Sequence, residues 1–395
     1  MAALIAFLSF CVMWVQWQSG ARIVKTSGDF VSFWTAGLLA LEGHATDAYQ
    51  SVPHFAKQIA LSGDATWGYL AFFYPPFFLL LCAGLALAGY KSALVLWLIA
   101  TLAGYVAATR ALLPKDWRTG EPAWLLFLGY PAVMVNAGYG QNGFLSASLL
   151  GGAAIWLDRR PVLAGICLGC LAYKPQLGII VPLALAAAGR WRCFASAAAT
   201  VVVLSAAATF VFGPDIWSAF FAGMADARRN WMEPVNELYL RLWITVYGAL
   251  RLHGSPLLLA YALQAVVTIT AATLLVRALL RRPPGARSGR AEIAAVAACV
   301  PFCSPFLLEY DLVILAIPMA WLLAEGLRAG FRRGEYAALA LAYFAPAFFK
   351  IEAFDYAIRP IVIVSSAALF AVVLRRMSGR PDSLEIAVPV TSGSR

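Results

Sequence analysis

Apolar runs of about 15–25 residues, separated by short polar or basic clusters, extend along almost the whole chain. Runs of this length are typical of membrane-spanning helices, whereas the strands of an outer-membrane barrel would alternate over about ten residues. The pattern therefore predicts an all-α, polytopic membrane protein with about twelve transmembrane helices. The predicted spans that follow the first helix are 91–112, 122–137, 143–157, 161–173, 176–188, 193–213, 256–276, 291–305, 311–326, 336–350 and 356–374.

Four apolar runs need a separate interpretation. Ala3–Val15 has no basic segment before it and no small-x-small cleavage site after it, so we expect a retained first helix. A full crossing by 72–88 would put a later basic cluster outside, so we expect a half-inserted or re-entrant helix there. The runs 161–173 and 176–188 are short for a bilayer, which predicts broken or partly buried helices.

Two long polar stretches, 18–69 and 213–254, are predicted to face the outside. Within the first, apolar residues between Phe30 and Leu41 follow i, i+3, i+4 spacing. This spacing predicts an amphipathic juxtamembrane helix over Phe30–Leu41 that lies in the membrane interface. We expect residues 1–377 to form a single membrane domain, and the polar segment 378–395 to be a disordered cytoplasmic tail.

Composition supports the membrane interpretation and excludes several classes of protein. Apolar residues make up 62% of the chain and charged residues only 13%, about half the share in a soluble domain. A soluble enzyme, a disordered protein and a fibrous protein are therefore excluded.

The net charge of +10 arises from 30 basic and 20 acidic residues. Basic residues gather in short loops, which marks those loops as cytoplasmic and makes nucleic acid an unsuitable partner. The main clusters are Arg110/Lys115/Arg118, Arg159/Arg160, Arg190/Arg192, Arg277/Arg281/Arg282/Arg287/Arg290, Arg328/Arg332/Arg333 and Arg375/Arg376/Arg380.

Metal ligands are not grouped in this sequence. The seven cysteines lie in or beside apolar runs, and Cys167 and Cys170 have no histidine or acid nearby. No acidic pair with metal-ligand spacing flanks Asp29. We therefore expect neither a metal nor another cofactor.

Asp29 is the acidic residue best placed for chemistry on the outer face. It follows Ser27-Gly28 and precedes the aromatic-rich segment Phe30–Leu41. Its side chain could cap that helix, or it could accept a proton from a hydroxyl nucleophile. An acid near several cations suits a reaction with an anionic leaving group.

Lys174 lies between two short apolar spans and is followed by Pro175. A lysine at the end of an interfacial helix can extend its ammonium into water. Alternatively, the ammonium and the N-terminus of the helix that Pro175 starts could bind an anion together.

Three further polar motifs lie at predicted outer ends of apolar spans. Tyr74 precedes Pro75-Pro76 at a helix start, and Gln141-Asn142 lies in the glycine-rich break Gly138–Gly143. The third motif is Glu309-Tyr310-Asp311, whose side chains could either cap a helix or bind sugar hydroxyls. We expect Tyr74, Gln141, Asn142, Glu309, Tyr310 and Asp311 to contact the substrate.

Taken in order, these motifs resemble glycosyltransferase family 87, the polytopic, mannosyltransferase-like proteins of the GT-C class. The resemblance extends over about residues 26–325. The motifs that carry it are Asp29-Phe30, Glu42-Gly43, Tyr74-Pro75-Pro76-Phe77, Gly89-Tyr90, Gly140-Gln141-Asn142, Lys174-Pro175, Ser304-Pro305 and Tyr310-Asp311-Leu312.

The resemblance implies a GT-C-like fold and an inverting transfer of mannose or another hexose or pentose on the extracytoplasmic face of the inner (plasma) membrane. It implies a polyprenyl-phosphate-linked sugar as donor and a lipid or glycan as acceptor. The general-base aspartate of the family's first outer loop maps onto Asp29. The cations that bind the lipid phosphate map first onto Lys174 and more loosely onto Arg228, Arg229 and Arg241.

Two other functions remain open at this point. A secondary transporter would need an ion- or proton-coupling acid in mid-span and two repeated halves. The predicted spans contain almost no such acid, and no repeat is visible. The other alternative is a protein that handles lipid or polysaccharide without catalysis.

Overall fold

The computed structural model describes residues 28–63, 68–114, 116, 124–234, 240–282, 288–348 and 358–379. All regular elements in these ranges are helical, apart from one isolated β-bridge between Trp243 and Leu308. The predicted first helix and most of the tail lie outside the described residues.

The first half of the described chain contains short helices around one long helix, α5. In order these are α2 (Phe30–Leu41), η1 (Ala45–Tyr49), α3 (Ser51–Ser62), α4 (Pro76–Ala86), α5 (Tyr90–Leu112), α7 (Trp124–Leu128), α8 (Pro131–Tyr139), α9 (Gly143–Trp156), α10 (Pro161–Cys170), η2 (Leu171–Tyr173), α11 (Pro175–Gly178) and α12 (Val181–Ala187).

The second half contains three long helices, α13, α17 and α21, and a π-helical turn, η3. In order the elements are α13 (Trp191–Phe212), α14 (Asp215–Ala227), η3 (Arg228–Met232), α16 (Val246–Leu252), α17 (Leu257–Leu280), α18 (Gly289–Cys299), η5 (Val300–Phe302), η6 (Glu309–Leu315), α19 (Ala316–Ala329), α20 (Glu335–Phe344), η7 (Ala345–Phe348) and α21 (Ile358–Met377).

Proline and glycine set many of the helix boundaries. Proline occupies the first turn of α4, α8, α10 and α11, where its missing N–H costs no helical hydrogen bond. Gly140 follows α8 with a φ of +62°, a left-handed conformation that side chains disfavour. The chain therefore turns sharply between α8 and α9.

Five helices in the described ranges are long and apolar enough to cross a membrane: Tyr90–Leu112, Trp191–Phe212, Leu257–Leu280, Glu309–Ala329 and Arg359–Met377. Apolar side chains on α13 such as Phe210, which is 91% exposed, suit contact with lipid. The all-α membrane class is confirmed, while the number of crossings stays a prediction.

The predicted breaks in the shorter spans are confirmed. The run 161–173 contains α10 and η2, and 176–188 is divided between α11 and α12. The helix α4 has 11 residues and spans about 17 Å, against about 30 Å for the hydrocarbon core. Its length agrees with a half-inserted helix in 72–88.

The helix predicted at Phe30–Leu41 has these bounds, but its surroundings differ from the prediction. Eight of its 12 residues are buried, because α2 packs against α4, η1 and α3. A Cβ at Gly37 would collide with the backbone of Cys82 on α4. Protein therefore covers most of this helix, while Leu41 at its end is 46% exposed. Its position relative to the membrane interface stays a prediction.

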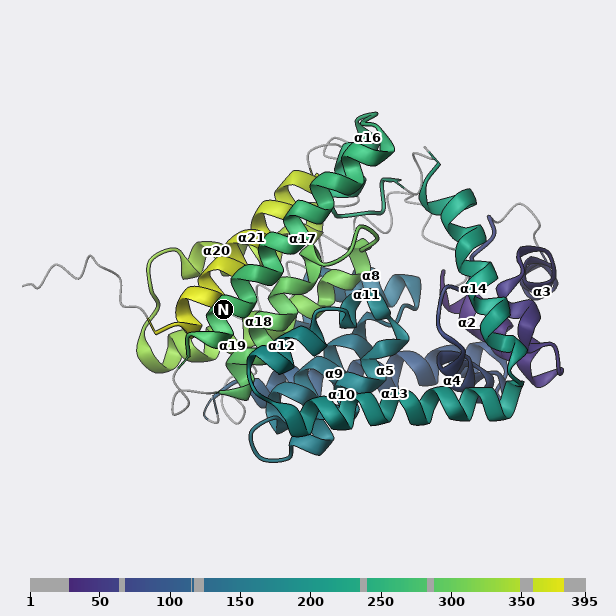
Figure 1. Ribbon diagram of the computed structural model, residues 1–395, viewed down its shortest axis with the longest axis horizontal. Helices are drawn as coiled ribbons and strands as arrows, with labels where there is room; N and C mark the ends of the chain where they lie inside the picture. The colour runs from purple at the N-terminus through teal and green to yellow at the C-terminus, as the bar shows by residue number, and fades with distance from the viewer. Residues whose placement is uncertain are drawn as a thin grey trace, which may run out of the picture.

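Figure 1 shows α2, α3, α4 and α14 at one end of the molecule and α17 to α21 at the other, with α5, α9 and α10 between them. Aromatic side chains join the elements near the first end. Phe33 contacts Tyr74 and Trp97 edge to face, and Phe78 stacks on Tyr173 at 4.8 Å between ring centroids. This buried cluster fixes α2, α4, α5 and η2 around the candidate site.

Candidate active site

Asp29 lies at the N-cap position of α2, but its side chain makes no capping hydrogen bond. Instead, Gln141 Nε2 donates a hydrogen bond of 2.6 Å to Asp29 Oδ2. The carboxylate is therefore turned toward the break between α8 and α9. The capping interpretation of Asp29 is wrong, because the side chain serves a contact between distant segments.

Burial raises the pKa of the half-buried Asp29 carboxyl from 3.8 to about 6. The hydrogen bond from Gln141 and the charge of Lys174 lower this pKa, while the charges of Asp311 and Glu309 raise it. A carboxyl with a pKa near 6 is mostly ionised at neutral pH and is a stronger base than an ordinary aspartate.

The break between α8 and α9 is held by hydrogen bonds on several sides. Asn136 Nδ2 donates to the carbonyl of Gln141 at 3.2 Å, and its Oδ1 accepts from Gly143 N at 2.8 Å. Trp97 Nε1 donates to the carbonyl of Gly140 at 3.0 Å. These contacts fix the backbone from which Gln141 and Asn142 project.

Gly143 allows η6 to approach this break. A Cβ at Gly143 would meet the Asn136 side chain, the Val313 side chain and the backbone carbonyl of Tyr310, each closer than 3.0 Å. Glycine is therefore required for the close packing that brings Glu309, Tyr310 and Asp311 beside Asn142.

Lys174 forms the charged centre of the site. Its Nζ donates to Asp311 Oδ1 at 2.5 Å and to Asn142 Oδ1 at 3.0 Å, and it lies 4.9 Å from the centroid of the Tyr310 ring. The side chains of Lys174 and Asp311 are 2% and 0% exposed. The interpretation of Lys174 as a lysine reaching into water is therefore wrong.

Tyrosine hydroxyls complete the cluster. Tyr74 donates to Gln141 Oε1 at 3.3 Å, and Tyr139 donates to Glu309 Oε1 at 2.9 Å. Asp311 Oδ2 also accepts from the Leu308 N–H at 3.4 Å, so the capping alternative for Asp311 holds in part. The structure brings together these residues predicted from sequence: Asp29, Tyr74, Gln141, Asn142, Lys174, Glu309, Tyr310 and Asp311.

The three arginines predicted to assist Lys174 make their described contacts elsewhere. Arg228 pairs with Glu233 at 2.5 Å and its side chain is 63% exposed, and Arg229 beside it is also exposed. The backbone carbonyl of Arg241 accepts a hydrogen bond from Arg359. The described contacts of these arginines involve neither Asp29 nor Lys174.

Two side chains at the site were not predicted from the sequence. Tyr139 donates a hydrogen bond to Glu309. Asn136 donates to the carbonyl of Gln141 and accepts from the N–H of Gly143. Tyr139 could have been found, because it lies inside the glycine-rich break. Asn136 lies within an apolar span, and an uncharged amide there gives a weak signal.

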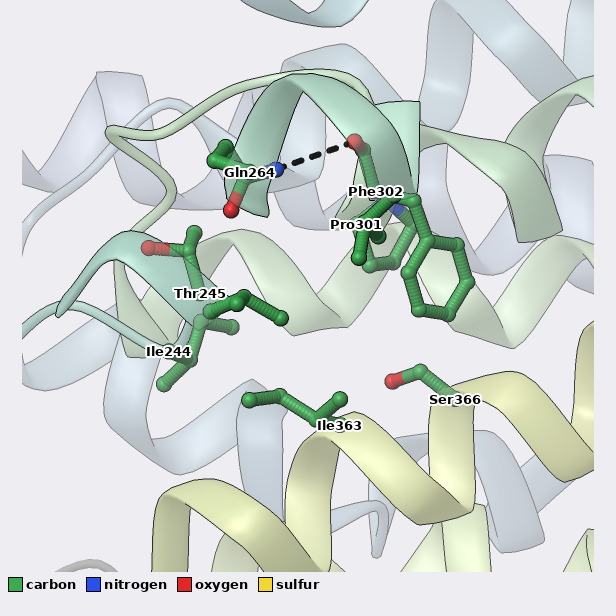
Figure 2. Close-up of a pocket in the computed structure, with 9 residues that line it drawn as sticks. Ile244, Thr245, Gln264, Pro301, Phe302, Ile363 and Ser366 are labelled. Carbon is green, nitrogen blue, oxygen red and sulfur yellow. Dashed lines mark hydrogen bonds between the residues drawn. The ribbon is translucent and has the colours of Figure 1, made fainter. Parts of the chain in front are cut away.

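A small cavity of about 10 Å³, partly open to the outside, lies apart from these residues. Figure 2 shows Ile244, Thr245 and Gln264 on one side of it and Ile363 and Ser366 on α21. None of the residues that line it belongs to the cluster around Lys174. The cavity therefore gives no additional support to the candidate site.

A carboxyl with a raised pKa beside a buried lysine is typical of a functional site, and the protein that carries this site is an all-helical membrane protein. The sequence matches glycosyltransferase family 87 over residues 72–305, more than half of the chain, so the protein belongs to this family and is a glycosyltransferase. No curated protein and no solved structure matches the chain. The family and the activity class predicted from the sequence are confirmed.

Proposed function

We propose that this protein transfers a sugar from a polyprenyl-phosphate-linked donor to a lipid or glycan acceptor on the extracytoplasmic face of the inner (plasma) membrane. The observation that carries the proposal is the Asp29 carboxylate, which is held at one oxygen beside the buried Lys174–Asn142–Asp311 cluster.

Asp29 is the proposed general base. A hydroxyl oxygen of the acceptor attacks the anomeric carbon of the donor, and Asp29 takes the hydroxyl proton as the new bond forms. The bond between the anomeric carbon and the phosphate oxygen breaks, and the polyprenyl phosphate leaves with the electron pair. Attack from the face opposite the phosphate inverts the configuration at the anomeric carbon.

Lys174 and Asn142 are the proposed ligands for the departing phosphate. An ammonium has three hydrogens, and two of those on Lys174 are used by Asp311 and Asn142. The third can reach a phosphate oxygen. Nδ2 of Asn142 is buried and has no hydrogen-bond partner in the described ranges, so a second donor is available beside the ammonium. Arg228, Arg229 and Arg241 are weaker candidates.

The sugar itself is proposed to contact Tyr74, Glu309, Tyr310 and Asp311. Carboxylates can accept hydrogen bonds from sugar hydroxyls, and an aromatic ring such as that of Tyr310 can pack against the apolar face of a sugar. The combination is suited to an uncharged hexose or pentose.

Asp29→Asn tests the assignment of the base. Asparagine keeps nearly the same shape but cannot accept the proton, so sugar transfer should fall by about 100-fold or more while donor binding persists. Transfer of radiolabelled sugar from polyprenyl-phosphate sugar in membranes is the measurement. Asp47→Asn is the control, because Asp47 is another acid of the first outer stretch and pairs with His44 at 3.8 Å.

Near-normal transfer by Asp29→Asn would contradict the assignment and would make Asp311 the next candidate. Solute uptake into vesicles, measured in parallel, distinguishes this function from secondary transport. The family match favours sugar transfer over transport and over lipid handling without catalysis.

A further inference from the structure

We infer that Gln141 is a positioning residue for Asp29 and not a ligand of the substrate. It fixes Oδ2 of Asp29 so that the other carboxylate oxygen faces the acceptor hydroxyl. This inference rests on the proposed function of Asp29 and names a residue on which that function depends.

The orientation of the Gln141 amide is set by its neighbours. The backbone N–H of Asn142 can only donate, and it lies 3.0 Å from Gln141 Oε1. The Tyr74 hydroxyl also approaches Oε1, at 3.3 Å. Because the oxygen must face these two donors, the NH₂ group must face Asp29, where it donates at 2.6 Å.

Both ends of this amide are engaged by protein groups, and Gln141 is only 3% exposed. A substrate contact through Gln141 would therefore require the loss of a buried hydrogen bond, which is costly. The sequence-based prediction that Gln141 contacts substrate conflicts with this geometry.

The same bond leaves one oxygen of Asp29 available. No hydrogen bond reaches Asp29 Oδ1 from the residues that the structure describes, while Oδ2 accepts from Gln141. A carboxylate fixed at one oxygen presents the other in a defined direction. A base displaced by about 1 Å can lose roughly 100-fold in rate, so this restraint matters for the reaction.

Gln141 also supports the charged form of Asp29. Its hydrogen bond and the Lys174 ammonium lower the pKa of Asp29, whereas burial and the carboxylates of Asp311 and Glu309 raise it. The tyrosines Tyr74, Tyr139 and Tyr310 also lie near Asp29 and stay uncharged at neutral pH. Without the Gln141 donor, the Asp29 carboxyl should require a higher pH to ionise.

Gln141→Leu is the first test, with sugar transfer measured as a function of donor concentration and pH. We expect kcat to fall roughly 100-fold with little change in the KM for the polyprenyl-phosphate sugar. We also expect the midpoint of the pH–rate profile to rise by about one unit. Gln141→Glu keeps the shape but places a second carboxylate beside Asp29, so it should raise the midpoint as well.

Gln58→Leu is the matched control. Gln58 is also buried, and its amide donates to the carbonyl of Leu70 and accepts from Leu70 N. Its removal should destabilise the protein and leave the pH midpoint unchanged. This control separates a general loss of packing from an effect on Asp29.

A rise in the KM with unchanged kcat and pH midpoint in both Gln141 variants would overturn the inference and make Gln141 a substrate ligand. If Gln141→Leu does not fold, an unshifted midpoint in Gln141→Glu would overturn it in the same way. The outcome for the proposed function is separate, because sugar transfer by the wild-type protein tests that function and Asp29→Asn tests the assignment of the base.

Discussion

Lys174 and Asp311, both almost fully out of contact with solvent, form the ion pair at the centre of the site. Removing one member of such a pair leaves the other charged and buried, which typically costs about 3–5 kcal/mol. The contribution of Lys174 to folding must therefore be separated from its proposed contribution to phosphate binding.

Lys174→Ala should lower sugar transfer by roughly 100-fold or more, because the phosphate loses a cation as its charge develops. The variant should also unfold at a lower temperature, because Asp311 loses its partner. Lys174→Arg should restore transfer only in part, since a planar guanidinium needs more room than an ammonium. Transfer assays and thermal unfolding in detergent measure the two effects.

The double variant Lys174→Gln/Asp311→Asn separates these effects. Two neutral amides remove the buried charges and retain a hydrogen bond, so much of the lost stability should return. Transfer should stay low because no cation faces the phosphate. Recovery of transfer in this variant would show that Lys174 contributes only to folding.

The raised pKa of Asp29 predicts how transfer depends on pH. The base must be ionised, so kcat/KM should rise with pH, reach half its maximum near pH 6, and level off above about pH 7. Below the midpoint, the rate should fall about tenfold per pH unit. The sign follows from a raised pKa: acid protonates the base and stops transfer. A flat profile between about pH 5 and 8 would contradict this assignment.

At the scale of elements, α2 and α4 approach closely at Gly37, and Asp29 immediately precedes α2. Gly37→Ala should push the two helices apart because the added carbon meets the Cys82 backbone, a cost of about 1–3 kcal/mol. Transfer should fall as well, since Asp29 moves with α2. Thermal unfolding and transfer assays on the same preparation measure both.

Gly84→Ala on α4 is the matched control, because a Cβ at this position meets nothing within 4 Å. Alanine in the helix should leave the protein unchanged or stabilise it by up to about 1 kcal/mol. Equal stability of the Gly37 and Gly84 variants would show that the contact between α2 and α4 is not tight.

Helix boundaries were the part of the fold that could be predicted best from the sequence. The bounds of Phe30–Leu41 and the start of α4 at Pro76 follow from local spacing and from proline. The burial of α2 does not follow, because the residues of α4 that cover it come 35 or more positions later in the chain. The periodicity of apolar residues predicts that a segment is helical, but it does not identify the elements that pack against that helix.

The residues of the candidate site could be predicted from the sequence to a similar extent. The sequence identified Asp29 and Lys174 as candidates, because charges are rare in this apolar chain. It could not choose between capping and catalysis for Asp29, since that choice depends on Gln141, which is 112 residues away. The phosphate-binding role expected for the arginines stays a prediction. Arg228 pairs with Glu233 and lies over the Tyr261 ring, and the backbone carbonyl of Arg241 accepts a hydrogen bond from Arg359.

At the scale of the whole molecule, basic loops that are distant in the sequence meet at one end. Arg190 bridges Asp158 and Glu292 at 2.7 and 2.8 Å, and Arg282 approaches Glu292 at 3.9 Å. The helix α9 connects this end to the site and has 14 residues, so it spans about 21 Å. Three of the arginine clusters predicted to be cytoplasmic therefore lie together, and the side of the membrane that they face stays a prediction.

Glu292→Ala should destabilise the protein by about 3 kcal/mol, because Arg190 loses a largely buried partner. Transfer per folded molecule should stay normal, since the change lies at the opposite end from the site. Glu325→Ala is the control: its pair with Arg328 is mostly exposed and contributes under about 1 kcal/mol. Thermal unfolding of the two variants compares them directly.

Orientation in the membrane can be tested with single cysteines placed at Ser62 and Ser288 in a variant without the seven native cysteines. An impermeant thiol reagent applied to intact cells should label the cysteine at position 62, in the stretch 18–69 predicted to face outside. It should not label the cysteine at position 288, in the arginine-rich loop predicted to be cytoplasmic. Equal labelling of both positions would contradict the predicted topology.

The separation of Lys174 and Asp311 in the sequence also has a consequence for biosynthesis. The two partners are 137 residues apart, so at about 5–20 residues per second the ribosome needs roughly 7–27 s to deliver the aspartate after the lysine. During that interval the ammonium lacks the carboxylate that it contacts in the folded protein, so it stays hydrated. The end of the bundle that holds the candidate site therefore closes late, only after η6 has emerged, and a chain truncated before η6 should leave this lysine in water.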